Sequence, residues 1–475
     1  MSEKTPSFKP TLSLLDATMI VAGSMIGSGI FIVSTEMTAS LGSSGWLILA
    51  WILTGFLTLT AAVSYGELSS MFPKAGGQYV YLREAFNPLT GFLYGWSLFA
   101  VIQTGTIAAV GVAFAKFAAY IFPALGDTNV LLHLGFTDIS AAELVAMILV
   151  IFLTYVNTKG IEGGKLVQTT FTLAKILSLL GLIVFGFLLA ADADTWKANW
   201  SDAWNVKKWI NDGGGFWETV SGAAVVPLFA SALVGSRFSS DAWNNVTFIA
   251  GEIKRPERNI GLSLFLGTLI VTIIYVSANL MYLSVMDMQE MATAPDGRVS
   301  LAASLKIFGG VGTIVIAVMI MVSTFGCNNG LILSGARVYY TMAKDGLFFK
   351  KTAVLNKHNV PGFALWIQCL WTCLLVLSGA YYELLTYVVF VVLIFYVLTL
   401  LGIFRLRKKR PDLPRPYKAW GYPLLPILYC IIALLICGAL FIYQSSQTWP
   451  GAIIVLLGIP LYYLAVANKK SKVKS

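Results

Sequence analysis

The sequence predicts an all-α integral membrane protein, because its composition and the spacing of its apolar windows both suit a bilayer. Of its 475 residues, 57% are hydrophobic and only 12% are charged, and the mean hydropathy is +0.76. A soluble globular domain has about 25% charged residues. Apolar windows long enough to cross a bilayer recur along the whole chain. These observations exclude a soluble globular protein.

Twelve apolar windows predict twelve transmembrane helices. The first window follows a short polar tail and has no A-x-A-like cleavage site, so we expect a span there and not a signal peptide. The five cysteines all lie in apolar runs and are expected to be free thiols. The twelve windows are residues 11–34, 43–71, 88–122, 140–157, 166–191, 216–249, 260–284, 310–343, 360–380, 383–404, 421–444 and 449–467.

The distribution of charge predicts the orientation of these spans. The connections after the even-numbered spans and the two tails hold most of the 33 Lys and Arg residues, including the cluster from Arg405 to Lys418. The positive-inside rule therefore predicts a multi-pass protein of the cell (inner) membrane with both termini in the cytoplasm. The net charge of +10 is explained in this way without a nucleic-acid partner.

The first span is interrupted at Gly23–Phe31, which reads G-S-M-I-G-S-G-I-F. Glycine and serine are poor helix formers, and a broken helix in lipid must find partners for its freed N–H and C=O groups. The amides of Ser28, Gly29 and Ile30 would begin a second half-helix, whose positive end suits a carboxylate. The alternative is a small-residue packing face of the G-x-x-x-G type.

The sixth span carries a second interruption, G-S-R-F-S-S-D-A-W-N at Gly235–Asn244. Paired interruptions in two halves of a chain indicate the substrate site of a solute carrier. Carbonyls of the unwound segment can accept hydrogen bonds from a substrate ammonium. Asp241 is either a substrate contact or the N-cap of the half-helix that follows. Phe238 is either a gate over the site or a packing residue.

Counting the spans predicts how the two halves are related. Five spans lie in each half, and an odd number makes the second half enter the membrane from the opposite side. We therefore expect a 5+5 inverted repeat, and a short helix near 301–307. The predicted divisions are a cytoplasmic tail at 1–10, repeat one at 11–191, an external loop at 192–215, repeat two at 216–404, a basic cytoplasmic loop at 405–420, a hairpin of spans eleven and twelve at 421–467, and a cytoplasmic tail at 468–475.

Three charged residues near the breaks need partners. Lys175, in the middle of span five, would find acceptors among broken-helix carbonyls, either as a fixed stand-in for a sodium ion or as a titratable proton carrier. Arg237 stays charged at any working pH. It is expected in a structural pairing or a watery vestibule, or else on the side-chain carboxylate of an acidic substrate. Glu252 is expected to pair weakly, during closure, with one of the basic residues that follow it.

Several motifs connect the chain with a known superfamily. They are G-S-M-I-G-S-G-I-F, F-S-S-D-A-W-N with the G-E-I-K-R-P-E-R-N that follows it, and G-A-R-V-Y-Y-T-M-A-K-D-G from Gly335 to Gly346. On these motifs the chain resembles the amino acid, polyamine and organocation (APC) transporters, above all the L-type amino acid transporters (LAT family) and their bacterial exchangers. The resemblance implies a LeuT-type fold with helices 1 and 6 broken. It also implies sodium-independent transport of neutral L-amino acids, by exchange or else by uniport.

The same resemblance implies roles for residues at both breaks. The substrate carboxylate would bind the amides of the first break, and its ammonium would bind carbonyls near Met25, Phe238 and Ser239, with Phe238 as the gate. Lys175 matches the lysine that replaces sodium in sodium-independent members. The candidate substrate-binding residues are Met25, Ile26, Gly27, Ser28, Gly29, Ile30, Phe238, Ser239, Ser240, Asp241 and Asn244.

Two departures from the family pattern narrow these expectations. The human light chains of the family carry a cysteine between spans three and four that bonds a heavy chain, but Phe122–Ile139 contains none, so no covalent heavy-chain subunit is expected. Arg237 stands where relatives usually have an apolar residue. Acidic substrates therefore remain an alternative, as does proton-coupled uptake.

No H-E-x-x-H, G-x-S-x-G or Walker A motif is present, so no enzyme activity, cofactor or metal is expected.

Overall fold

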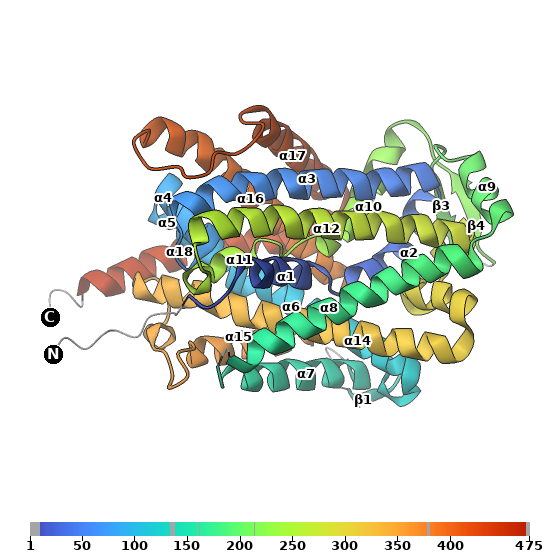
Figure 1. The fold of residues 1–475 in the computed structure, drawn as a ribbon, viewed down its shortest axis with the longest axis horizontal. Coiled ribbons are helices and arrows are strands. Elements are labelled where there is room, and N and C mark those ends of the chain that lie inside the picture. The colour runs from blue at the N-terminus through green and yellow to red at the C-terminus, as the bar shows by residue number, and fades with distance from the viewer. Residues whose placement is uncertain (1–9, 134–137, 161, 213, 378–380, 472–475) are drawn as a thin grey trace.

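The chain folds into long helices that run side by side along the long axis of the molecule (Figure 1). The computed structural model describes residues 10–133, 138–160, 162–212, 214–377 and 381–471. Two short β-hairpins lie at one end, which we call the hairpin end. The opposite end carries the connection at 410–423, and we call it the basic end.

The elements before the second break are mainly helical. The first of them are α1 (Leu14–Met25), α2 (Gly29–Leu41), α3 (Ser44–Met71), α4 (Gly77–Ala85), α5 (Pro88–Ser97), the π-helical turn η1 (Leu98–Ile102), α6 (Gln103–Ile121) and the short η2 (Pro123–Leu125). They are followed by the antiparallel pair β1 (Val130–His133) and β2 (Asp138–Ser140), then by α7 (Ala141–Asn157), α8 (Glu162–Phe185) and η3 (Gly186–Ala190). The long connection holds α9 (Ala193–Ser201), β3 (Lys207–Ile210), β4 (Phe216–Thr219) and η4 (Gly222–Ala224).

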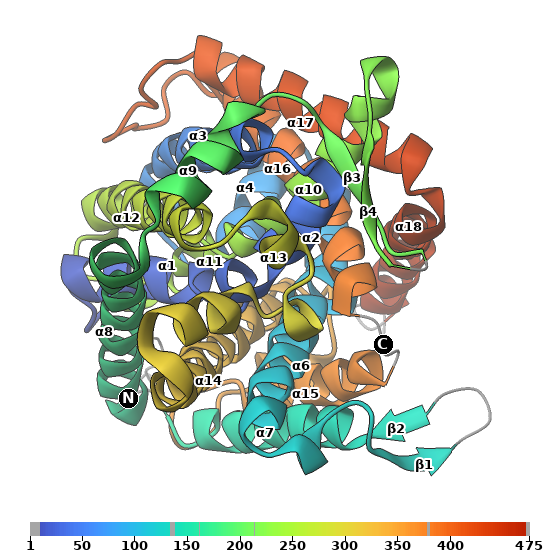
Figure 2. The same cartoon turned by 90° about the vertical axis from the view of Figure 1, so that its right-hand side faces the viewer.

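The remaining elements complete the helical bundle. They are α10 (Val225–Ser239), α11 (Asn245–Phe248), η5 (Ala250–Glu252), α12 (Pro256–Val285), α13 (Met288–Ala292), η6 (Pro295–Gly297), α14 (Val299–Lys344), η7 (Lys350–Ala353), α15 (Gly362–Val376), α16 (Tyr381–Lys409), α17 (Leu424–Tyr443) and α18 (Ser445–Ser471). Seen along the long axis, α7, α8, α17 and α18 lie at the periphery, and α2 and α10 lie in the interior (Figure 2).

The helices agree with the apolar windows of the sequence. Within the described residues, ten helical segments are long and apolar enough to cross a membrane, and α7 and α15 are shorter apolar helices. Each of the twelve predicted windows overlaps one of these segments. The chain is therefore a multi-pass membrane protein. The helix expected near 301–307 is also present, as the start of α14 before a kink at Gly309 (φ 69°).

The predicted start of the sixth span, at residue 216, is wrong. Residues Phe216–Thr219 form β4, which pairs antiparallel with β3. The Trp217 ring packs on Trp209 with their centroids 5.0 Å apart. The aromatic side chains made this strand look like part of an apolar span, but cross-strand pairing satisfies its backbone outside the bundle. The connection before the sixth span therefore extends beyond residue 215, and the helix begins at Val225.

Candidate functional site

The first break separates α1 from α2 within one predicted span. Regular helix ends at Met25 and begins again at Gly29. Between them the amide of Gly27 donates to the Met25 carbonyl at 2.8 Å, a tight turn that leaves the last carbonyls of α1 without helical partners. In a membrane these carbonyls need other donors. Side chains from three neighbouring helices supply them.

Lys175 of α8 is the first of these donors. Its ammonium donates to the carbonyls of Gly23 at 2.6 Å and Ile26 at 2.9 Å, with the Ser323 carbonyl at 3.5 Å. The side chain is fully buried. A buried ammonium is tolerated only where acceptors replace its water shell, and three carbonyl dipoles do so here. The contact between Lys175 and the first break, predicted from the sequence, is thus present.

Two side chains of α14 and one of α12 satisfy the same stretch of backbone. The Cys327 thiol donates to the Ser24 carbonyl at 3.2 Å, and the Ser323 hydroxyl to Ile26 at 3.3 Å. The Tyr275 hydroxyl lies 2.9 Å from the Met25 carbonyl. Sequence reasoning missed these donors because it considered only ionisable groups inside the spans. A search for every hydrogen-bonding side chain in an apolar window would have included them.

Tyr275 also connects the two breaks. Its hydroxyl oxygen lies 3.1 Å from the Ser239 carbonyl at the end of α10, while it contacts the Met25 carbonyl. A hydroxyl has one proton to donate, so the two carbonyls share a single donor. The carbonyl ends of both broken helices therefore converge on one point. Both are among the carbonyls, near Met25, Phe238 and Ser239, that the resemblance assigns to a substrate ammonium.

The two broken helices touch at Gly29. A Cβ atom at this position would lie 2.0 Å from the Ser239 Oγ atom and 2.8 Å from the Ser239 Cα atom. Only glycine allows this approach. The position is therefore constrained by helix packing, which was the alternative interpretation of the small residues. The packing at Gly27 is less tight, because a Cβ atom there would lie 3.0 Å from the Cys327 sulfur.

The second break is built differently from the first. Helix α10 ends at Ser239, Ala242 has φ +62°, and α11 spans only four residues from Asn245. A left-handed conformation at a non-glycine residue costs roughly 1–2 kcal/mol. The interpretation of Asp241 as an N-cap is wrong, because Asn244 holds that position and makes no side-chain cap. Asp241 instead accepts a hydrogen bond from the Tyr396 hydroxyl of α16 at 2.6 Å.

Asn244 faces a small polar cavity on the basic-end side of the break. Its amide donates to Gln78 of α4 at 2.9 Å, and Gln78 donates in turn to Thr399 at 3.0 Å. Asp241 and Tyr396 line the same cavity. The cavity volume is about 10 Å³, which holds about one water molecule. The cavity therefore has no room for an amino acid in this conformation.

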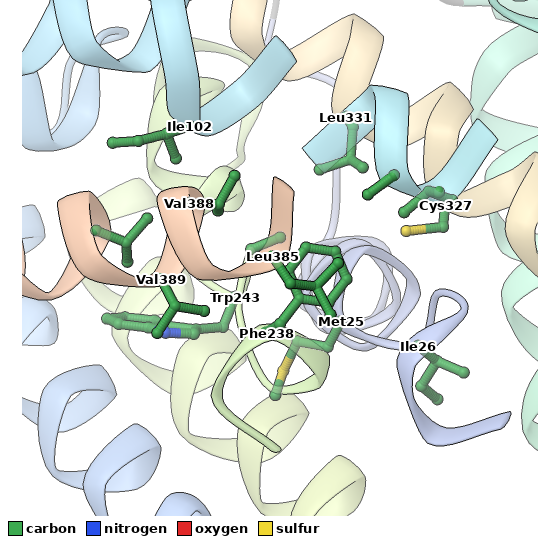
Figure 3. Packing of buried hydrophobic residues seen from close by; sticks show 14 of the residues in the cluster. Met25, Ile26, Ile102, Phe238, Trp243, Cys327, Leu331, Leu385, Val388 and Val389 are labelled. Atoms are coloured by element: carbon green, nitrogen blue, oxygen red, sulfur yellow. The ribbon is translucent and has the colours of Figure 1, made fainter. Parts of the chain in front are cut away.

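Phe238 lies on the core side of α10 and is 6% exposed. Figure 3 shows its ring beside Met25 of the first break and Leu385 of α16, with Trp243 to their left. The ring thus packs between the two broken helices and α16. This placement agrees with either predicted role, gate or packing residue.

Arg237 has partners, but they are neutral. Its guanidinium donates to the Thr58 hydroxyl at 3.4 Å and to the Tyr429 hydroxyl at 3.3 Å. The residue is only 4% exposed, so the watery-vestibule interpretation is wrong for this conformation. Asp241 is close enough to attract the charge, although no described Arg237 contact is an ion pair with it. Because Tyr429 belongs to α17, the C-terminal hairpin is in contact with the second break.

The predicted partner of Glu252 is also wrong. Glu252 pairs with Arg337 of α14, with 3.0 Å between Oε1 and Nε, and both side chains are buried. The basic residues next to Glu252 in sequence remain at the surface, whereas packing brings α14 over it. The Glu252 carbonyl also accepts the amides of Thr11 and Leu12 at 2.9 Å each. The segment before α1 is therefore tied to the end of the second break.

A further polar cluster connects α4 with α14 and α16 at the basic end. The Tyr79 hydroxyl donates to Asp345 at 2.7 Å, and Arg83 contacts the same carboxylate. Burial raises the pKa of Tyr79 well above its usual range, which keeps the donating proton in place. Glu84 pairs with Arg410 at 3.1 Å. These contacts and the Glu252 pair connect distant segments of the chain at the basic end.

Comparison of the sequence with known proteins identifies the family of this chain. The family model "Amino acid permease" matches residues 12–465. The chain belongs to the amino acid permease family. It is 30% identical to the "Serine/threonine exchanger SteT" of Bacillus subtilis (strain 168) over 474 residues, covering 99% of this chain and 100% of that protein. It is 30% identical to the human "Large neutral amino acids transporter small subunit 2" and 29% identical to the human "Asc-type amino acid transporter 1", covering 97% of this chain and 81% and 83% of those proteins.

These relatives confirm the superfamily that the motifs indicated. The family model describes amino acid permeases, and the relatives named above are amino acid transporters and exchangers. The roles of the individual site residues do not follow from family membership. They depend on the contacts described above.

Proposed function

We propose that this permease carries neutral L-amino acids across the cell membrane by alternating access, without sodium and in exchange for another amino acid. The observation that carries the proposal is the Lys175 ammonium bound between the carbonyls of Gly23 and Ile26. A fixed cation at the carbonyl end of a broken helix supplies the charge that a bound sodium ion would otherwise supply. Transport therefore needs no cation from solution at this place.

The substrate would bind between the two breaks. Its carboxylate would bind the amides of Ser28, Gly29 and Ile30 at the start of α2, where the helix dipole favours a negative group. Its ammonium would bind the carbonyls of Met25 and Ser239. The convergence of these carbonyls on the Tyr275 hydroxyl supports this arrangement, because a substrate ammonium can bridge them in the same way.

Neutral substrates are favoured over acidic ones by the surroundings of Arg237. Its guanidinium is directed to Thr58 and Tyr429, and an acidic side chain would have to displace these contacts. The names of the relatives, which refer to serine, threonine and large neutral amino acids, support the same choice. Asp241 in the small cavity would repel an acidic side chain further.

The orientation follows from charge. The basic end would face the cytoplasm, with both termini there, because the connections at this end carry most of the Lys and Arg residues. The hairpin end would face outward. The two broken helices would then belong to two inverted five-span repeats, with α17 and α18 added after them. No covalent heavy chain is expected.

Uptake into proteoliposomes tests the proposal. Labelled L-serine should enter vesicles preloaded with unlabelled amino acid, at the same rate when choline replaces sodium. Strict sodium dependence would contradict the role of Lys175, and uptake driven by a proton gradient into empty vesicles would favour symport. Competition by alanine, serine, leucine, glutamate and aspartate defines the substrate class. Strong competition by the acidic pair that is lost in Arg237→Leu would show acidic transport.

A further inference from the structure

A separate cavity opens between the hairpin end and Phe238. Its volume is about 180 Å³, many times the ~10–15 Å³ that one water molecule needs on this measure, so it has room for a small solute. Its walls come from α2, α10, α16 and the junction of α17 with α18. The residues that carry the argument are Glu36, Ser231, Gly235, Leu385, Gln444 and Gln447.

This cavity leads to the proposed substrate site. Gly235 in its wall lies one helical turn before Ser239, and the Ser239 hydroxyl donates to the Gly235 carbonyl at 2.9 Å. Leu385, another wall residue, lies beside the Phe238 ring (Figure 3). A solute in the cavity would therefore be separated from the two breaks by the ring of Phe238.

Two acceptor groups of the cavity are available to a cationic solute. Glu36 of α2 is the one charged residue among those that line it, and it has no ion-pair partner within the described part of the chain. Gln444 donates to the Ser231 hydroxyl at 2.8 Å, and its buried carbonyl oxygen has no hydrogen-bond partner among the described residues. A carboxylate and an unpaired carbonyl suit an ammonium group. Lys208 of β3, close enough to attract Glu36, places a positive charge near the same mouth.

We propose that this cavity is a reception site for the α-ammonium group of an incoming amino acid, with Glu36 as its main acceptor. The inference rests on the proposed transport of amino acids and extends it to selectivity at the entrance. A fixed negative charge in a partly enclosed cavity attracts cationic groups and repels anionic ones. Neutral and cationic amino acids are admitted to Phe238, and acidic amino acids are disfavoured before they reach the breaks.

The test is initial uptake of L-serine from the hairpin side by the parent, Glu36→Gln and Glu218→Gln. Glu218 lies exposed on β4 at the same end, so its variant loses the same charge outside the cavity. Glu36→Gln should raise the half-saturating serine concentration up to about fivefold, with an unchanged maximal rate, because partly exposed charge pairs contribute up to about 1 kcal/mol. Glu218→Gln should behave like the parent.

Charged competitors and added salt test whether the effect of Glu36 is electrostatic. In Glu36→Gln, competition by L-lysine should weaken and competition by L-glutamate should strengthen. The difference from the parent should shrink at about 1 M salt, where charges are screened within about 3 Å. Glu36→Asp should restore the parental profile, which separates loss of charge from misfolding.

Three outcomes would overturn the reception site. They are a half-saturating concentration in Glu36→Gln equal to that in Glu218→Gln, a fall in maximal rate alone, and an unaltered response to lysine and glutamate. Failure of the parent to transport any amino acid is a different result, because it would contradict the proposed function itself.

Discussion

The two breaks solve the same physical problem in different ways. At the first, the freed carbonyls of Gly23 to Ile26 accept hydrogen bonds from side chains of three other helices. The fixed ammonium of Lys175 contacts two of these carbonyls. At the second, backbone strained at Ala242 is accompanied by side-chain hydrogen bonds from Tyr396 to Asp241 and from Asn244 to Gln78. The first break is therefore an anchor whose freed backbone carbonyls are held by several side-chain donors, whereas the second is held mainly through its own side chains. Substitutions at the first should accordingly cost more.

The largest effect is expected for Lys175→Ala. The substitution leaves the carbonyls of Gly23 and Ile26 without their ammonium donor in a water-excluded place, and each unsatisfied buried group costs about 1–3 kcal/mol. Serine exchange should fall at least about a hundredfold while the protein still elutes as a folded species. Lys116→Ala, which removes a lysine from α6, is the matched control and should retain most transport. Undiminished exchange in Lys175→Ala would remove the basis for calling the first break an anchor.

Gly29→Ala should be the next most harmful change, because it forces the two breaks apart. The added Cβ atom meets the backbone of Ser239, and overpacking of this kind costs about 1–3 kcal/mol. Thermal unfolding in detergent should show a clear loss of stability, with transport reduced as well. Gly181→Ala in α8, where nothing lies within 4 Å of the new atom, should be neutral or slightly stabilising. Equal melting temperatures for the two variants would refute the tight contact.

Tyr275→Phe tests the donor that the two breaks share. Loss of the hydroxyl frees the carbonyls of Met25 and Ser239 for competition by water, at a cost of about 1–2 kcal/mol. We expect roughly a tenfold change in the serine half-saturation constant or rate. The control is Tyr282→Phe, whose hydroxyl makes one long contact, 3.5 Å to the Ile30 carbonyl. A larger effect at Tyr282 would mean that the bridge is not important for substrate binding.

The smallest effect is expected for Tyr396→Phe at the second break. Asp241 loses one hydrogen bond, and about 1 kcal/mol corresponds to roughly a fivefold change in transport. The variant should respond more strongly than the parent to substrate size, because the segment from Ser240 to Asn244 becomes less restrained. Competition by alanine, serine and leucine measures this. A loss as severe as that of Lys175→Ala would show that both breaks are equally constrained.

The apolar windows and the two breaks were predictable from local sequence. A bilayer requires a long run of apolar residues for each crossing, so each of the twelve apolar windows coincides with an apolar helix. Stretches rich in glycine and serine identified both interruptions. The contact between Lys175 and the first break was also predictable, because an isolated ammonium in an apolar span requires acceptors and freed carbonyls require donors. The error at Phe216–Thr219 arose because aromatic residues suit a hairpin as well as a span.

Pairings between distant residues were decided by the tertiary structure alone. Tyr275 between Met25 and Ser239, Tyr429 beside Arg237, and Arg337 on Glu252 join residues from different helices. Periodicity and composition describe which face of a helix is apolar, but not which neighbour covers it or at what height. These partners depend on how the helices are packed and aligned in the bundle. The sequence alone therefore determined where the helices break, and packing determined which side chains satisfy the broken ends.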